Sequence, residues 1–514
     1  MAQIRCCTAS GCRAAGGDAL LQALQQARGH QGLSPAALSI KAVGCLRLCG
    51  RGPLVALDPA DGGCQKLYGA VPPASALALV QLALAPHAPG AATALAAHAV
   101  DGDHPFFALQ QPVVLEGLGW VDPESIDDAL AHGAYSQLQR CRAEARPEQV
   151  RACIRSSGLR GRGGAGYPTG LKWDTVALQP KGPRLVVCNA DEGDPGAFMD
   201  RAVLEGDPHR LLEGLAIAAF AVGAELGYVY LRAEYPLAIA RLRRALRQLR
   251  QRGLLQGLDL QLRVGAGAYV CGEETALLAS IAGGRGTPRQ RPPYPAQQGL
   301  FGRPTLINNV ETLAAVPAIL RRGADWYAAL GTGRSRGTKV FSLSGALPHT
   351  GLVEVPMGTS LRTVVETMGG ASGVKAVQTG GPAGGCIPSA LLDTPIAYET
   401  LAELGSMLGS GGMVVLPEGL PMPQLVRYFM GFCAAESCGK CVPCRAGTVQ
   451  LAQLLDRFCA GRGSAGDLQQ LEQLGRMVQA TSLCGLGQGA PNPVFSTLRH
   501  FRHEYEAACG GAPR

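Results

Sequence analysis

A glycine-dense loop, a short apolar run and an acidic run follow one another at residues 158–173, 185–187 and 189–196. This order most constrains the fold. A buried strand with polar side chains at its carboxyl end is typical of an open α/β sheet, where ligands bind at that edge. Glycines let a backbone approach a phosphate and turn its N–H groups toward it. The stretch predicts a mononucleotide site in an α/β domain.

The loop combines glycines with positive side chains. Its glycines are Gly161, Gly163, Gly164 and Gly166, and its cations are Arg160, Arg162 and Lys172. A G-x-G-x-x-G pattern means a Rossmann turn when a strand precedes it and a helix follows. Here residues 150–159 have helical spacing, and Pro168 interrupts the expected following helix. We therefore interpret the loop as an anion cradle of another kind, against the alternative of a plain surface turn.

Three further segments carry candidate nucleotide contacts. They are Asn189, Asp191, Glu192 and Asp194 after the apolar run; Tyr269, Gly272, Glu273 and Glu274 in a second glycine turn; and Tyr294, Asn308, Asn309 and Thr312 further on. Carboxylates are tolerated at a helix amino terminus, and capping explains one of the two adjacent glutamates. The second glutamate favours a contact with a ribose or an amide.

Composition bounds the class of protein. A chain of 514 residues with 47% hydrophobic content predicts two to four domains. The net charge is +8, but arginines are dispersed among acids, so nucleic acid is not favoured as a partner. The first residues contain no apolar segment of a signal peptide, and the apolar stretch 211–231 contains two glutamates. We expect a cytoplasmic protein without membrane insertion.

The 18 cysteines predict metal or redox ligation rather than disulfides in such a chain. Cys438, Cys441 and Cys444 form a C-x2-C-x2-C run, and Cys484 provides a fourth thiolate. Three thiolates on one loop and one remote cysteine are typical of a [4Fe–4S] cluster. Zinc is the alternative, but structural zinc sites usually take cysteines as separated pairs.

Two cysteine pairs near the amino terminus predict a second metal site. Cys7 and Cys12 have C-x4-C spacing, and Cys45 and Cys49 have C-x3-C spacing. These pairs suit a [2Fe–2S] cluster, and zinc remains an alternative. Cys6 can replace Cys7 as a ligand, although Cys7 gives the regular spacing.

The periodicity predicts a multidomain α/β protein. It indicates a β-β-α-β order at 338–378 and bundle helices at 424–433, 447–458, 467–479 and 493–507, the third with an apolar stripe of Leu468, Leu471 and Leu474. We expect a thioredoxin-like [2Fe–2S] domain at 1–88, a linker at 89–104, a Rossmann-like nucleotide domain at 105–335, a ubiquitin-like β-grasp domain of the soluble-ligand-binding type at 336–420, and a [4Fe–4S] helical bundle at 421–514. The Ala/Gly/Pro-rich linker indicates that the amino-terminal domain folds on its own core.

Six segments in order resemble the motifs of a known family. They are residues 158–173, 188–201, 269–275, 308–312, 436–445 and 482–487. Together they resemble the flavoprotein family of the NADH-binding (51 kDa) subunit of respiratory complex I. The amino-terminal cysteine domain and the sequence of residues 193–201 look most similar to the diaphorase subunit of bidirectional NAD(P)-reducing [NiFe] hydrogenases. NAD-dependent formate dehydrogenases use a similar subunit.

The resemblance implies FMN, a [4Fe–4S] cluster and a [2Fe–2S] cluster as cofactors, with NAD(H) as substrate. A hydride would pass between NADH and FMN, and single electrons would pass between FMN and the clusters. FMN would be the catalytic group, and no side chain would act as a catalyst. By position, Tyr167, Lys172, Asn189, Asp191, Glu192, Tyr269, Glu274, Asn308 and Asn309 match the family. Asp194 departs from it, because complex I subunits usually have glutamate there. The implied partners are a small thioredoxin-like [2Fe–2S] subunit, an iron–sulfur subunit and hydrogenase subunits.

Two expectations remain open. Glu192 and Asp194 favour NADH over NADPH if the adenosine ribose lies nearby, because they repel a 2′-phosphate. The competing class is a scaffold protein with a zinc-stapled bundle and a vestigial nucleotide site.

Overall fold

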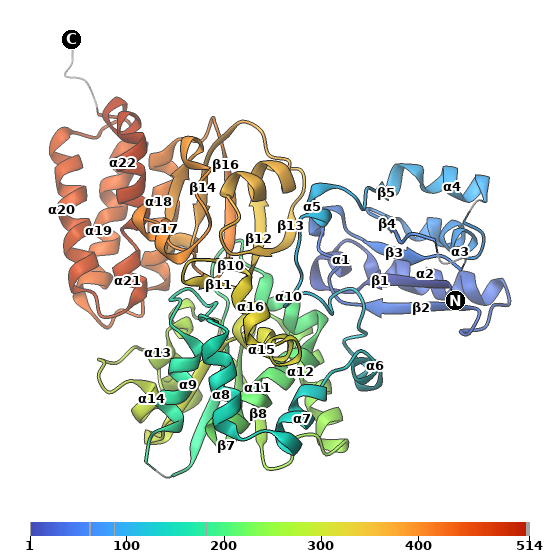
Figure 1. Cartoon of the computed structure of the whole chain (residues 1–514). Helices are drawn as coiled ribbons and strands as arrows, with labels where there is room; N and C mark the ends of the chain where they lie inside the picture. The colour runs from blue at the N-terminus through green and yellow to red at the C-terminus, as the bar shows by residue number, and fades with distance from the viewer. Residues whose placement is uncertain (1, 61–62, 87, 181, 510–514) are drawn as a thin grey trace.

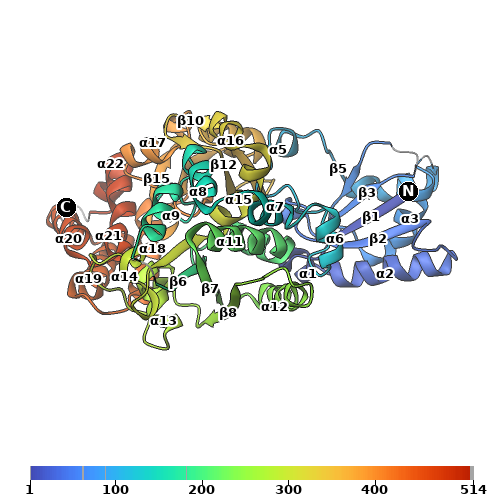
Figure 2. The same cartoon turned by 60° about the horizontal axis from the view of Figure 1, so that its bottom comes forward.

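The computed structural model describes residues 2–60, 63–86, 88–180 and 182–509. Three large sheets and a helical bundle make up this part of the chain (Figure 1). The amino-terminal sheet and the bundle lie at opposite ends of the molecule, and the other two sheets lie between them (Figures 1 and 2). No helix among these residues is both long and apolar enough to cross a bilayer.

The amino-terminal part forms a five-stranded sheet of order β2-β1-β3-β4-β5. Its elements are β1 (Ala2–Cys7), α1 (Ser10–Ala14), α2 (Gly17–His30), β2 (Leu38–Val43), β3 (Val55–Asp58), β4 (Lys66–Tyr68), α3 (Ala76–Leu84), α4 (Pro89–Leu95) and β5 (Ala99–Val100). Strand β1 is parallel to β2 and antiparallel to β3. One face of the sheet packs on α2 and α3 through Ile4, Leu24 and Leu79.

The expected linker at 89–104 is wrong, because this segment is part of the amino-terminal fold. Its helix α4 buries Ala91 and Leu95 in the core shared with α2 and α3. Its strand β5 pairs antiparallel with β4. The small side chains that resemble a linker in composition here allow close packing.

The second part contains the four-stranded sheet β8-β7-β6-β9, with all strands parallel. Its elements are α5 (Pro105–Ala108), α6 (Ile126–Ala131), α7 (Ser136–Glu144), α8 (Pro147–Ser156), α9 (Thr169–Ala177), β6 (Arg184–Ala190), α10 (Met199–Gly206), α11 (Pro208–Val222), β7 (Ala224–Arg232), α12 (Pro236–Gln251), β8 (Asp259–Gly265), α13 (Glu274–Ile281), α14 (Pro295–Gln298), β9 (Thr305–Asn309), α15 (Val310–Arg322) and α16 (Ala324–Ala329). Leu185 and Val187 pack on the α13 side, whereas Val186 and Cys188 pack on the α11 side. Burial on both faces explains the continuous apolar run of β6.

The third part is a sheet of order β13-β12-β16-β14-β15. Its elements, with the small β10–β11 hairpin, are β10 (Gly331–Thr332), β11 (Ser335–Arg336), β12 (Thr338–Gly345), β13 (Gly351–Pro356), a π-helix (Thr363–Met368), β14 (Val374–Thr379), β15 (Gly385–Pro388), α17 (Tyr398–Glu403) and β16 (Gly412–Pro417). The β-β-α-β order expected from the sequence is present, and β16 adds a central strand parallel to β12.

The carboxyl-terminal part is a helical bundle, as predicted. It consists of α18 (Met422–Glu436), α19 (Val442–Cys459), α20 (Ala465–Thr481), the short α21 (Gly485–Gly489) and α22 (Asn492–Ala507). Leu468 and Leu471 on the predicted stripe of α20 are buried in its core. The loop between α18 and α19 and the start of α21 lie at the same end of the bundle (Figure 1).

The amino-terminal part does not fold on its own core alone. The second face of its sheet, with Cys7, Val43 and Ala56, belongs to the large core that also contains α11 and α15. A Cβ built on Gly44 would lie 2.4 Å from the Cα of Gly206, so the two backbones are in direct contact. The amino-terminal part therefore packs directly against α10 and is not joined to the next domain by a linker alone.

Candidate nucleotide site and cysteine clusters

The carboxyl edge of the parallel sheet contains the topological switch point of this domain. The chain runs from β6 outward through β7 and β8, and then returns to the opposite side of β6 as β9. Open α/β sheets bind ligands in the crevice at such a point. Asn189 of β6 and Asn309 of β9 are paired there.

The glycine loop lies over this crevice. Gly164 and Gly166 have positive φ values of 118° and 62°, which glycine adopts without strain. A Cβ on Gly163 would be 3.0 Å from Cβ of Asn309, so a larger residue would collide with the strand end. The backbone N–H of Arg162 donates to Thr312 Oγ1 at 2.8 Å. The loop connects α8 to α9 and so follows a helix, as expected for a site that is not a Rossmann turn.

Pro168 does not interrupt a helix. It occupies the residue before α9, where its ring fits an extended backbone, and Thr169 begins the helix. The interpretation of Pro168 as a helix breaker is therefore wrong, because the residue sets where the helix begins.

The expected positive charge of the loop is reduced to one side chain. The Arg162 guanidinium is buried and donates to Tyr398 Oη, Tyr327 Oη and the carbonyl of Arg336. Arg160 pairs with Glu399 at 2.6 Å. Both guanidinium groups are thus engaged by protein groups and stabilise the fold of the loop.

Lys172 is the remaining cation of the loop. Its Nζ lies 3.4 Å from Glu274 Oε2 and 3.3 Å from the carbonyl of Ile307. The side chain is 27% exposed. It therefore lies between the end of β9 and the second glycine turn, with one long ion pair that an anion can displace.

The acidic run begins with a connected pair at the end of β6. Asn189 Nδ2 donates to the carbonyl of Gly272 at 2.9 Å, and its Oδ1 accepts from Asp191 N–H at 3.1 Å. Asp191 Oδ1 lies 3.3 Å from Arg232, whereas its Oδ2 is buried without a hydrogen-bond partner. Burial raises the pKa of Asp191 to about 7, although Arg232 opposes the shift. An orphaned buried acceptor at this edge fits a ligand with hydroxyl donors, such as a ribityl or ribose chain.

Glu192 and Asp194 are occupied by the protein itself. Glu192 accepts the backbone N–H groups of Asp200 and Arg201, each at 3.0 Å, at the amino terminus of α10. Asp194 accepts from Tyr269 Oη and Ser410 Oγ, each at 2.8 Å. Burial raises the pKa of both carboxyl groups. The repulsion argument for NADH over NADPH therefore loses its basis in these two residues.

The second glycine turn divides its two glutamates between different tasks. Glu273 caps α13 by accepting from the N–H groups of Thr275 and Ala276 at 2.9 and 3.0 Å. Glu274 instead pairs with Lys172 and, at 3.2 Å, with Arg291. One carboxylate thus serves capping and the other faces the loop cation.

The aromatic candidates also differ in surroundings. Tyr269 donates its hydroxyl to Asp194 and is partly buried on the cysteine side of the turn, where its ring contacts Phe432. Tyr294 and Tyr167 are both 52% exposed. The Arg291 guanidinium lies 5.9 Å from the centre of the Tyr294 ring, so one exposed ring lies next to the cation that pairs with Glu274.

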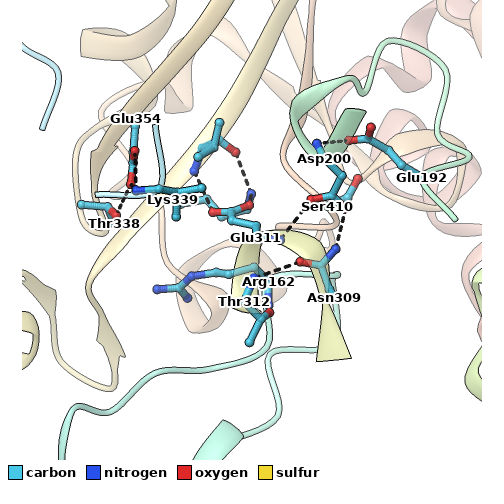
Figure 3. A network of polar contacts seen from close by, with 12 residues as sticks. Arg162, Glu192, Asp200, Asn309, Glu311, Thr312, Thr338, Lys339, Glu354 and Ser410 are labelled. Atoms are coloured by element: carbon cyan, nitrogen blue, oxygen red, sulfur yellow. Dashed lines mark hydrogen bonds and ion pairs between the residues drawn. The ribbon is translucent and has the colours of Figure 1, made fainter. Parts of the chain in front are cut away.

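The amides at the end of β9 are held in place by different donors. Asn308 Oδ1 accepts from Trp173 Nε1 at 2.9 Å. Asn309 Oδ1 accepts from Thr312 N–H at 3.3 Å and caps α15. Its Nδ2 donates to Asp200 Oδ2 at 2.6 Å (Figure 3). The sequence analysis did not include Asp200 among the candidate site residues.

Two further groups at this edge were missed by sequence reasoning. Arg232 ends β7 and contacts Asp191, and Ser410 comes from the loop before β16. The apolar and aromatic residues 228–231 before Arg232 are typical of a strand, so a signal for Arg232 was available. Ser410 is brought in from the third sheet, and no local pattern points to it.

The bundle cysteines surround one cavity. Cys438, Cys441, Cys444 and Cys484 line it together with Val270 and Leu486. Burial raises the pKa of Cys444 to about 11 and also raises that of Cys484. Among the described residues that line the cavity, four are thiols and none is acidic. This donor set fits a [4Fe–4S] cluster, in which each thiolate binds a different iron.

The second glycine turn connects this cavity to the nucleotide edge. Val270 lines the cavity, and the neighbouring Tyr269 N–H donates to Glu436 Oε2 at 3.0 Å. Arg285 donates to the carbonyl of Cys438 at 2.8 Å. The second glycine turn thus contacts both the cysteine cavity and the nucleotide edge of the sheet.

The amino-terminal cysteines form a chain of sulfur contacts. The thiols of Cys12 and Cys45 hydrogen-bond to Cys7 and hold its pKa well below the usual thiol range. The sulfurs of Cys45 and Cys49 lie 3.5 Å apart. Two sulfurs on one tetrahedral metal with bonds of about 2.3 Å are separated by about 3.8 Å, so this pair fits a shared metal ion.

Cys6 points to the opposite face of β1. Successive strand residues alternate between faces, and Cys6 packs with Ile4 toward α2, where its thiol lies 3.8 Å from the carbonyl of Gly17. Cys7 lies on the face that carries Cys12 and Cys45. Among the residues that the structure describes, no three side chains of His, Cys, Asp or Glu are arranged around a point that could hold a single metal ion.

Comparison with known proteins agrees with this geometry. The model of the Nuo51 FMN-binding domain matches residues 154–318, and that of the NADH-ubiquinone oxidoreductase-F iron-sulfur binding region matches residues 424–508. These matches define the class, an oxidoreductase subunit with an FMN-binding domain and an iron–sulfur region.

Relatives that match most of the chain define the family. The NADP-reducing hydrogenase subunit HndC of Solidesulfovibrio fructosivorans is 49% identical over 410 residues, which are 77% of this chain and 83% of the relative. An NADH-quinone oxidoreductase subunit of Rhizobium meliloti (strain 1021) is 44% identical over 77% of this chain and 97% of its own. The chain belongs to this family, the 51 kDa flavoprotein subunits of NADH-quinone oxidoreductases and related hydrogenases.

A solved structure extends the likeness over the entire chain. The NAD+-reducing [NiFe]-hydrogenase in the H2-reduced state matches with a TM-score of 0.72 and 33% identity, and the match covers 100% of this chain and 84% of the solved one. The amino-terminal sheet is thus included in the likeness to this hydrogenase.

Proposed function

We propose that this chain is the diaphorase subunit of an NAD(P)-reducing hydrogenase complex and exchanges electrons between NADH and iron–sulfur clusters. One observation carries the proposal. The second glycine turn places the nucleotide edge of the sheet directly beside the cavity lined by the bundle cysteines. FMN, when bound, supplies the exchange of a hydride with NADH and of single electrons with the clusters.

The chain's own residues would hold the flavin and the nucleotide. Backbone N–H groups of the glycine loop and the Lys172 ammonium provide donors for a phosphate. Asp191 offers an unpartnered buried acceptor for a hydroxyl group. The proposed contact set is Gly161, Arg162 (backbone), Gly163, Gly164, Gly166, Tyr167, Lys172, Asn189, Asp191, Tyr269, Gly272, Glu274, Tyr294, Asn308, Asn309 and Thr312. Glu192, Asp194 and Glu273 shape the loops around it through their backbone and side-chain contacts.

Two cysteine sets would hold the clusters. We assign Cys438, Cys441, Cys444 and Cys484 to a [4Fe–4S] cluster and Cys7, Cys12, Cys45 and Cys49 to a [2Fe–2S] cluster. The face of β1 on which Cys7 lies supports Cys7 over Cys6 as a ligand.

The finer fold assignments rest on strand order. The β2-β1-β3-β4 order with a parallel first pair supports a thioredoxin-like amino-terminal domain. The β13-β12-β16-β14-β15 order with a parallel central pair supports a β-grasp domain. With β5 included, the boundaries that we propose are 1–104, 105–335, 336–420 and 421–514.

The hydrogenase relatives support a hydrogenase module as electron partner. NADH-quinone oxidoreductase subunits of similar identity support the alternative of a complex I subunit, and a formate dehydrogenase β subunit is a further alternative. We propose a cytoplasmic site of action, with other iron–sulfur subunits and NADH/NAD+ as partners and with no nucleic acid.

A visible spectrum tests the proposed function. We expect flavin and iron–sulfur absorption that bleaches on addition of NADH. A colourless protein that contains zinc would support the scaffold alternative instead.

Replacement of one bundle cysteine tests the assignment of the clusters. We expect Cys441→Ser to remove one [4Fe–4S] EPR signal while FMN remains bound, because the cavity and the glycine loop lie in different parts of the fold. Cys459→Ser is the matched control, since Cys459 is exposed at the far end of the same helix. An unchanged EPR spectrum in Cys441→Ser would contradict the ligand assignment, and loss of all flavin from a folded protein would contradict the layout.

A further inference from the structure

Asp200 is a buried carboxylate that contacts the end of β9. It lies in the first turn of α10 and is 3% exposed. Its Oδ2 accepts from Asn309 Nδ2 at 2.6 Å, and its Oδ1 accepts from the Glu311 N–H at 3.3 Å (Figure 3). Burial and the neighbouring carboxylates raise its pKa.

The neighbouring carboxylates are held by other donors. Glu192 accepts two backbone N–H groups of α10. Glu311 accepts from Val340 N–H at 2.9 Å and pairs with the buried Lys339. Asp200 is the member of this acidic group that bonds a side-chain amide at the switch point. Burial of an acid is costly unless it is hydrogen-bonded, and the Asn309 amide and the Glu311 N–H provide the hydrogen bonds for Asp200.

The contacts of Asn309 fix which end of its amide is which. Its Oδ1 accepts the Thr312 N–H, and its Nδ2 donates to Asp200. A flipped amide would place its oxygen against the carboxylate and its NH2 group against an N–H donor. Both contacts therefore select the same orientation, and together they use one of the two hydrogens on Nδ2.

The second N–H group of the Asn309 amide lies on the side of the glycine loop. A Cβ on Gly163 would lie 3.6 Å from Nδ2 of Asn309, so the amide nitrogen is next to the glycine loop. Asp200 thus holds an amide donor at the place where the glycine loop crosses the sheet edge.

We propose that Asp200 is a positioning residue that makes Asn309 a hydrogen-bond donor, rather than an acceptor, toward the flavin. The inference rests on the proposed function and deepens it. The cofactor atom recognised by Asn309 is therefore one with a lone pair, a carbonyl or ring nitrogen or a phosphate oxygen, and not a hydroxyl that must donate.

The first test measures retention of FMN by the holoenzyme. We expect Asp200→Ala to weaken FMN binding about tenfold, as for loss of one hydrogen bond, measured as the dissociation constant from fluorescence of released flavin. Glu354→Gln is the control, because Glu354 is equally buried and accepts from backbone N–H groups of Val114 and Leu115. It should lower the melting temperature without a change in FMN affinity. Equal affinities in Asp200→Ala and the wild type would overturn the proposal.

The second test exchanges the two side chains. In the double variant Asp200→Asn/Asn309→Asp, the amide on α10 can donate to the carboxylate on β9, and the carboxylate can still cap α15. We expect its melting temperature to recover relative to Asn309→Asp, while its FMN affinity stays at least tenfold weaker than in the wild type. A purely structural role predicts recovery of both and would sink the proposal.

The swap also separates this inference from the proposed function. If the wild-type protein holds no flavin, the proposed function itself fails. If the wild type holds FMN and the swap holds it equally well, the role of Asp200 fails alone. The double variant remains informative if Asp200→Ala does not fold, because it keeps the buried hydrogen bond.

Discussion

The acidic residues after β6 share a stretch of sequence but have unequal surroundings. Glu192 and Asp194 each accept two hydrogen bonds from the protein, whereas Asp191 keeps one buried oxygen without a partner. Their presence at the strand end could be predicted from the sequence. Which of them faces a ligand could not, because it depends on donors from α10 and from the loop before β16. At the residue scale, the candidate ligand contact is therefore Asp191 Oδ2, the buried oxygen without a hydrogen-bond partner.

Asp191 makes a pH prediction possible. Its folded pKa of about 7 lies above the unfolded value, so the folded chain binds the proton more tightly. The stability that this group contributes is fully present below about pH 4 and is lost as the pH rises through about 7. In the flavin-free protein, Asp191→Asn removes this penalty, so its melting temperature should exceed that of the wild type at pH 8 by more than at pH 5.

The size of this effect is bounded by the pKa shift. A shift of about three units corresponds to about 4 kcal/mol as an upper limit. Asp259→Asn is a suitable control, since this carboxylate is 54% exposed. The same difference at both pH values in Asp191→Asn would show that the carboxyl does not titrate in this range. FMN retention by Asp191→Asn should fall, because the amide oxygen would face the Arg232 donor and an NH2 group would take the place of the unpartnered acceptor Oδ2.

Helices were predicted better than strands at the scale of elements. The periodicity of the bundle gave the approximate positions of its four long helices, because each buries one apolar stripe within the bundle. Strands β4, β5, β7, β9, β10, β11, β15 and β16 were missed. Central β16 pairs with β12, more than sixty residues earlier, and such pairing leaves no local signal. The short β4 and β5 lie at or next to a sheet edge.

The glycine loop gives a prediction about an element. A Cβ at Gly166 would lie 2.6 Å from the Tyr398 ring, and the residue has a φ of 62°. We expect Gly166→Ala to distort the loop and to release FMN from a folded protein, measured by the flavin content after gel filtration. Gly32→Ala is the matched control, because Gly32 has a φ of 64° and open space around it. It should cost about 1 kcal/mol through its backbone alone and keep its flavin. Equal flavin content in the two variants would contradict a cofactor role for the loop.

Docking of the amino-terminal sheet is a property of the whole molecule, and it could not be predicted from the composition. The Ala-rich segment 89–104 resembles a linker, and this led to the expectation of an independent domain. Besides the apolar face with Cys7, Val43 and Ala56, the sheet is fixed by backbone contacts and isolated polar pairs, which have no sequence period. Ser10 N–H donates to Glu205 at the end of α10, and Gly50 N–H donates to the Thr350 carbonyl before β13. The two cysteine loops are thus seated on the second and third sheets.

Deletion of the amino-terminal part should therefore destabilise the remainder. A chain that begins at residue 105 exposes the apolar face that packs against Cys7, Val43 and Ala56. We expect it to aggregate or to melt well below the full chain, measured by gel filtration and thermal unfolding. A monodisperse fragment with the melting temperature of the full chain and with NADH-dependent reduction of an artificial acceptor would restore the independent-domain interpretation.

A point substitution tests the same docking without removing any chain. A Cβ at Gly44 would lie 2.4 Å from the Gly206 Cα, so Gly44→Ala must separate the cysteine loop from α10. We expect faster amide hydrogen exchange in residues 45–49 and in α10 than in the wild type, because their shared contact opens. Gly29→Ala, which adds its methyl group on α2 with nothing within 4 Å, should leave both segments protected. Since α10 also carries Asp200, loosening in Gly44→Ala that reaches the amino end of this helix should lower FMN retention as well, whereas unchanged exchange in α10 would show that the amino-terminal sheet does not brace the flavin site.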